Sequence, residues 1–155
     1  MAPFRTHMVG ELGEVEPETS VKVAGWIAYR RLHKRVAFVG LRDGSGMVQV
    51  VCAPQEIAGV SRESCVTVTG VVRTRLAPDG NHPGTSQVEV ADGRIEVLAA
   101  AATLPFAIEG SEANGGARRR WRYLDMRRRD ARRHLLLPSA APLRAPPIRA
   151  GGRLR

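Results

Sequence analysis

The sequence has little of what metal proteins, secreted domains and many enzymes depend on. Its 155 residues contain two cysteines, Cys52 and Cys65, and four histidines that lie far apart. These cysteines make neither a disulfide framework nor a set of metal ligands, so we expect a cytoplasmic protein that holds no metal. The phosphate-binding loop GxxxxGK[ST], the zinc motif HExxH and the nucleophile turn GxSxG are all absent, which argues against the enzyme classes that they mark.

Long apolar stretches are also missing. No run approaches the ~18 residues that a membrane span requires, and no apolar signal segment follows the N-terminus. We therefore expect no membrane partner. The length suits one globular domain with a tail and is short for an enzyme of two domains.

Lysine is scarce, and the basic charge is unevenly placed. Of the 24 basic residues only Lys22 and Lys34 are lysine, and the formal net charge is +9. Residues 117–155 carry thirteen arginines against two aspartates, whereas residues 1–116 have a net charge of −2. The total charge therefore does not by itself make the body of the protein a nucleic-acid binder.

Three short segments alternate apolar and polar residues with a period of two, which predicts strands with one buried face. Val21–Arg30 places Tyr29 on the same face as its buried valines, Val36–Arg42 follows, and Met47–Cys52 completes a meander. Between the last two, the glycines of Asp-Gly-Ser-Gly at 43–46 are expected to supply the positive φ of a tight turn. Gln55–Ser64 is expected to form a short, imperfect helix.

Further strands are predicted in the second half of the chain. Cys65–Arg75 is a long strand interrupted by Gly70, a residue that often marks a bulge or a barrel bend. A loop rich in proline and glycine follows at Leu76–Thr85. Ser86–Ala91 and Arg94–Leu98 are predicted as two half-strands around Asp-Gly.

Five strands with a helical piece between the third and the fourth predict an all-β protein with the OB-fold, a Greek-key barrel. A five-stranded barrel of another topology stays open. We expect the barrel at 1–108 and a linker region at 109–137, within which an arginine-rich segment, 118–133, is helical. Residues 138–155, rich in proline and arginine, are expected to be disordered.

A group of residues near the first two strands has the chemistry of RNA binding. Five potentially cationic side chains fall within Arg30–Arg35, Phe38 lies on the second strand, and Gln49 lies on the third. On an OB-fold this face holds single-stranded nucleic acid, with aromatic rings stacking on bases and arginines binding phosphates. The alternatives are that Phe38 belongs to the core, that the basic run is a solvated loop, and that Gln49 is an ordinary surface residue.

Seven stretches occur in the order found in one protein family. They are Arg5-Thr6-His7 with Gly10-Glu11-Leu12, VAGWIAYRR, FVGLRDGSGMVQVV, CVTVTGVVRTR, VEV…IEVL, LPFAI and RWRYLDMRRRD. Together they resemble the N-terminal anticodon-binding domain of bacterial aspartyl-tRNA synthetases, and the match extends from Arg5 to about Leu137.

The resemblance implies an OB-fold that binds the anticodon loop of aspartate tRNA. The positions that match the family's RNA contacts are Arg31, Phe38, Gln49, Arg75, Asn81 and Glu89. By this resemblance Phe38 stacks on the central anticodon uracil, Gln49 hydrogen-bonds that base, and Glu89 lies near the first anticodon base. The two arginines contact the loop, and Asn81 belongs to the loop between the last two strands.

The chain also departs from the family. Gly40 stands where the family usually has aspartate, and Tyr29 stands in a hairpin where the family is rich in arginine. After Leu137 the family continues into a catalytic domain that binds ATP and magnesium, whereas this chain continues into an unrelated tail, as a frameshift would produce. The resemblance therefore implies no aminoacylation and no cofactor on this chain alone, with tRNA and an intact synthetase as candidate partners. Non-specific RNA binding through the arginine-rich tail and a non-functional gene remnant are the alternatives.

Overall fold

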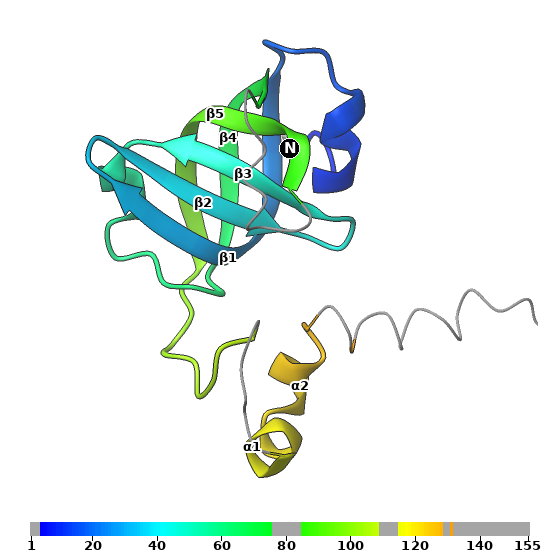
Figure 1. Cartoon of the computed structure of the whole chain (residues 1–155), viewed down its shortest axis with the longest axis vertical. Coiled ribbons are helices and arrows are strands. Elements are labelled where there is room, and N and C mark those ends of the chain that lie inside the picture. Colours follow the sequence, from blue (N-terminus) through cyan, green and yellow to red (C-terminus); the bar gives the residue numbers. More distant parts are fainter. Residues whose placement is uncertain (1–3, 76–84, 109–114, 129–130, 132–155) are drawn as a thin grey trace, which may run out of the picture. The chain divides into compact units, whose positions relative to one another are not determined.

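The computed structural model describes residues 4–75, 85–108, 115–128 and 131, and its first compact unit, which ends at Leu104, is a β-barrel (Figure 1). The strands are β1 (Ser20–His33), β2 (Val36–Arg42), β3 (Met47–Cys52), β4 (Cys65–Thr74) and β5 (Thr85–Ala99). They close in the order β1-β2-β3-β5-β4. This arrangement confirms the predicted OB-fold.

Strand β1 closes the barrel because it pairs with two neighbours in turn. Its first half, from Ser20 to Trp26, is antiparallel to β4, and its second half, from Trp26 to His33, is antiparallel to β2. Strands β3 and β5 are parallel. The core consists mostly of fully buried valines at alternate strand positions, namely Val21, Val23, Val39, Val48, Val50, Val66, Val68 and Val72. Leu12, from the 3₁₀ helix η1 (Val9–Glu14), is also fully buried.

The predicted bounds of β2 and β3 are confirmed, but other elements differ. Strand β1 continues to His33, so part of the basic run belongs to a strand. The expected helix at Gln55–Ser64 is only one turn of 3₁₀ helix, η2 (Pro54–Ile57), and Gly59 follows it with a φ of 74°. The two expected half-strands form one strand, β5, because Asp92 takes a φ of 53° and the pairing with β4 continues beyond it.

The turn between β2 and β3 is held by a side chain, so the expected role of its glycines was wrong. Among the described glycines, a positive φ occurs only at Gly59. The Asp43 carboxylate instead accepts hydrogen bonds from the backbone N–H groups of Ser45 and Gly46 at 2.7 and 2.9 Å, and from the Ser45 hydroxyl at 2.7 Å. Its other oxygen accepts one from the backbone N–H of Val9 at 2.9 Å, which ties η1 to the turn.

The predicted bulge in β4 is confirmed at Gly70. The pairing register with β5 shifts between Thr69 and Val71. A Cβ atom on Gly70 would lie 2.6 Å from the carbonyl oxygen of Ala91, so a side chain does not fit at this bend.

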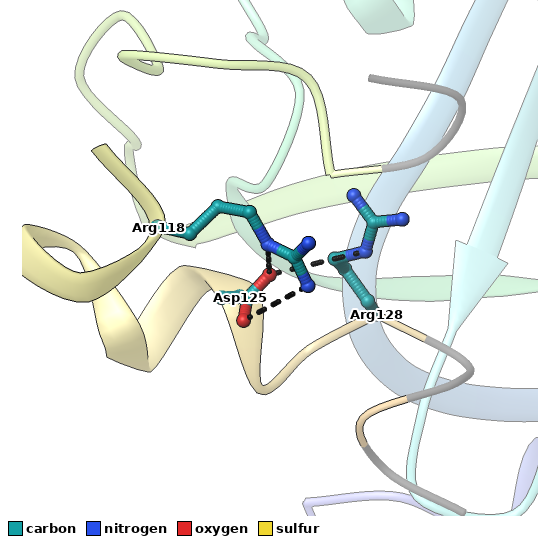
Figure 2. A network of polar contacts seen from close by, with 3 residues as sticks. All are labelled: Arg118, Asp125 and Arg128. Carbon is teal, nitrogen blue, oxygen red and sulfur yellow. Dashed lines mark hydrogen bonds and ion pairs between the residues drawn. The ribbon is translucent and has the colours of Figure 1, made fainter. Parts of the chain in front are cut away.

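The second unit begins at Pro105 and contains two short helices, α1 (Gly115–Arg120) and α2 (Arg122–Asp125). The expectation of a partly helical segment is confirmed here. Figure 2 shows Asp125 between Arg118, whose Nε donates to it at 2.7 Å, and Arg128, whose Nε lies 3.9 Å away. The hydrogen bond from Arg118 is the main reason why the pKa of Asp125 is lowered. The expected disordered stretch, 138–155, lies outside the described residues. Within the described ranges, no helix is long and apolar enough to cross a membrane.

Candidate nucleic-acid interface

The outward face of β2, β3 and β5 carries three of the predicted site residues, Phe38, Gln49 and Glu89. Each lies between two buried neighbours of its strand, and these neighbours are Ala37, Val39, Val48, Val50, Val88 and Val90. Because successive side chains of a strand alternate between its faces, the three residues point away from the core. Phe38 and Glu89 are half-buried, while Gln49 is 8% exposed. The structure therefore places Phe38 outside the core.

Cross-strand pairing arranges the outward face in two adjacent rows. The first, the Phe38 row, joins Arg31 of β1, Phe38 of β2 and Val51 of β3. The second, the Gln49 row, joins Tyr29, Gly40, Gln49, Glu89 and Arg73 from five successive strands of the barrel. Residues that pair directly lie on the same face, so a flexible ligand on this face meets both rows at once.

Gln49 and Glu89 form the polar centre of this face. Gln49 Nε2 donates a hydrogen bond to Glu89 Oε2 at 3.0 Å. Because only the nitrogen of the amide is a donor, the carboxylate fixes which way the amide points. Gln49 then keeps one N–H donor and its Oε1 acceptor for a ligand. This donor–acceptor pair complements the carbonyl and N3–H edge of uracil.

Arg75 lies just beyond β4, beside the same carboxylate. Its Nε is 4.0 Å from Glu89 Oε2, and its side chain is only 5% exposed. The Nη1 atom of Arg75 is buried and has no hydrogen-bond partner among the described residues. Buried donors are nearly always satisfied in folded proteins, so this nitrogen is an exception within the part of the chain that the structure describes.

The basic run near the β1–β2 turn divides into two groups. Arg31, Lys34 and Arg35 are exposed at or near the turn, with Arg31 directly opposite Phe38. Arg30 pairs with a core position of β2, and its Nη1 donates to the carbonyl oxygen of Val60 at 2.7 Å. Arg30 therefore anchors the segment that follows η2 and is not directed toward the outward face that we assign to the ligand.

The sequence pattern placed Tyr29 on the wrong face of its strand and gave no indication of Arg73. Tyr29 was expected beside the core valines, but the pairing of β1 with β2 shifts by one residue between Ile27 and Tyr29. The shift turns Tyr29 to the outward face, opposite Gly40, because one extra residue reverses the alternation. Arg73 pairs with Glu89 on this face and forms ion pairs of 3.2 Å with Glu18 and Asp92. No sequence signal singles out Arg73, and Asn81 lies outside the described residues.

Comparison with known proteins gives a consistent result. Residues 21–98 match the family described as OB-fold nucleic acid binding domain. The chain is 46% identical over 143 residues to the aspartate–tRNA(Asp/Asn) ligase of Thermobifida fusca, a match that covers 89% of this chain and 24% of the ligase. The corresponding ligase of Salinispora tropica is 44% identical over 142 residues, with 89% and 23% covered.

Solved structures agree on the fold. The aspartyl-tRNA synthetase of Entamoeba histolytica superposes with a TM-score of 0.77 at 20% identity, covering 86% of this chain and 34% of the other. The chain thus spans about a quarter of the length of the curated relatives, 24% and 23% for the two ligases.

Proposed function

Because the chain belongs to the family of OB-fold nucleic acid binding domains, we propose that its barrel binds the anticodon loop of a tRNA, that of aspartate tRNA in particular. The observation that carries this proposal is the oriented Gln49 amide, held by Glu89 one row away from the half-buried ring of Phe38. Stacking and hydrogen bonding in this arrangement need no cofactor.

Each residue of the interface has a distinct part in the proposed binding. Phe38 stacks on the central base of the loop, and the free N–H and Oε1 of Gln49 pair with the edge of that base. Glu89 keeps one oxygen for the donor groups of a neighbouring guanine. Arg31 and Arg75 bind acceptors of the loop, Arg31 at the exposed rim and Arg75 beside Glu89.

The test of this proposal is the replacement Phe38→Ala. Loss of the stacked base is expected to weaken binding of an aspartate anticodon stem-loop by about 1–3 kcal/mol, about 5- to 150-fold, measured by fluorescence anisotropy. Leu32→Ala is the control, because Leu32 is exposed on β1 but pairs with a core position of β2. Equal affinities of Phe38→Ala and the parent protein contradict the proposal.

Gln49 is expected to account for the choice of base. Gln49→Leu keeps most of the volume and removes the donor and the acceptor, so the preference for a central uracil over cytosine should fall by about 1–3 kcal/mol. The measurement compares two stem-loops that differ only at this base. A preference that survives in Gln49→Leu would assign base recognition to another residue.

We assign the catalytic steps of the related ligases to the part of those enzymes that lies outside the stretch matched by this chain. We propose that the stretch matched here, about a quarter of those enzymes at 24% and 23%, supplies tRNA recognition in the cytoplasm. The ATP and magnesium chemistry then belongs to the remainder of such enzymes, and an intact synthetase is a second candidate partner for this chain.

A second candidate function rests on the arginine-rich helices. Asp125 engages Arg118 and Arg128, whereas Arg119, Arg120 and Arg122 are exposed. These exposed guanidinium groups favour non-specific RNA binding, which falls steeply with salt. If this function dominates, Phe38→Ala binds like the parent protein and stem-loops of different sequence bind alike.

A further inference from the structure

The ring of Tyr29 lies over Gly40 on the outward face of the barrel. A Cβ atom placed on Gly40 would lie 2.2, 2.4 and 2.9 Å from Cε1, Cδ1 and Cζ of Tyr29, so the ring occupies the space directly above this glycine. The Tyr29 hydroxyl oxygen is buried, while the residue as a whole stays partly exposed. An aromatic ring that covers a glycine on the opposite strand is a known way to stabilise such a pair.

Two departures from the aspartyl-tRNA synthetase pattern therefore meet at one place. Gly40 replaces an aspartate and Tyr29 replaces a residue of an arginine-rich hairpin, and the two are directly paired across β1 and β2. No side chain fits at position 40 while the ring is present, since the nearest ring atom would be 2.2 Å away. Glycine at position 40 therefore leaves the room that the Tyr29 ring occupies.

The position of this ring relies on the β-bulge in β1. The register shift between Ile27 and Tyr29 brings Tyr29 into the Gln49 row, next to the Phe38 row. Phe38 and Gly40 are two residues apart on β2, which places them about 7 Å apart on the same face, and Gly40 and Gln49 are one strand spacing of about 5 Å apart. An aromatic surface therefore lies beside both the Phe38 ring and the Gln49 amide.

We infer that Tyr29 is a second stacking platform, which takes the base next to the one that stacks on Phe38. This inference rests on the proposed RNA-binding function. Proteins that bind single strands stack successive bases on neighbouring aromatic rings, because every base offers a π-face. Arg31, two residues along β1 and exposed, is placed to contact the phosphate between the two nucleotides.

The experiment distinguishes the contribution of the aromatic face of Tyr29 to RNA affinity from the contribution of its volume. Tyr29→Leu still covers Gly40 with apolar atoms but removes the π-face, and we expect anticodon stem-loop affinity to fall about 5- to 150-fold. Tyr29→Phe keeps the ring and should stay within about twofold of the parent. Gly40→Ala retains the tyrosine and displaces its ring, so it should lose affinity as Tyr29→Leu does. Thermal unfolding of each variant shows that it is folded.

Stem-loops that lack a single base identify the partner of each ring. The loss caused by Tyr29→Leu should disappear on the RNA that lacks one base adjacent to the central position, whereas the loss caused by Phe38→Ala should disappear on the RNA that lacks the central base. If Tyr29→Leu binds like the parent, or loses equally on every such RNA, the second platform is overturned while Phe38 keeps its role. If neither variant changes affinity, the proposed binding of the anticodon loop by the barrel itself fails.

Discussion

Replacing Glu63 by alanine is expected to lower the free energy of unfolding by about 3–5 kcal/mol. The Glu63 carboxylate accepts two hydrogen bonds from Arg42 Nη2, at 2.9 and 3.0 Å. The two side chains are only 4% and 14% exposed. Loss of the carboxylate leaves the Arg42 guanidinium buried without a counter-charge, and Arg42 ends the strand that carries Phe38. Urea unfolding followed by circular dichroism measures the change.

Glu18 provides a closely matched control for Glu63. Both glutamates have a positive φ, 63° for Glu18 and 65° for Glu63, and both pair with an arginine. The Glu18 side chain is 67% exposed, however, and its 3.2 Å ion pair with Arg73 is open to water. Glu18→Ala should therefore cost at most about 1 kcal/mol. Similar losses for the two variants would show that burial of the Arg42–Glu63 pair is not the cause.

Replacing Asp43 by alanine is expected to cost about 3 kcal/mol of unfolding free energy. The change removes the common acceptor of the N–H groups of Val9, Ser45 and Gly46, and hydrogen bonds to a charged acceptor contribute about 1.5–3 kcal/mol each without being additive. Ser45→Ala leaves the carboxylate and these three backbone donors in place, so its loss should be smaller. A larger loss for Ser45→Ala contradicts this account of the turn.

The stability that Asp43 contributes should depend on pH. Burial acts to raise the pKa of Asp43, but the hydrogen bonds from Ser45, Val9 and Gly46 together outweigh it, so its pKa lies below the ordinary 3.8. The unfolded chain therefore takes up the proton first as the pH falls, and the contribution present above 3.8 is lost as the pH falls through the lowered pKa. The stability difference between the parent and Asp43→Asn should shrink in this range, and a constant difference would show that the charge of Asp43 does not matter.

The fold follows from the sequence to a large extent, because alternating apolar residues identify strands wherever one face is buried. The bounds of β2 and β3 and the bulge at Gly70 agree with that pattern. Strand β5 was split in the prediction because Asp-Gly usually ends a strand. In the barrel Asp92 accepts a positive φ and the ladder with β4 continues past it.

Composition and spacing also determined which residues are chemically suited to bind RNA, and they singled out Phe38 and Gln49 as neighbours on one face. Only the tertiary structure decided how these side chains are oriented and which contacts they make. The carboxylate that orients Gln49 comes from β5, forty residues away in the sequence, and no local pattern contains that contact. Tyr29 reaches the outward face because the barrel closes through a register shift in β1, and Arg30 is withdrawn to the carbonyl of Val60. A period of two describes a single strand, whereas the closure of the barrel determines where that period is interrupted and which side chains then meet.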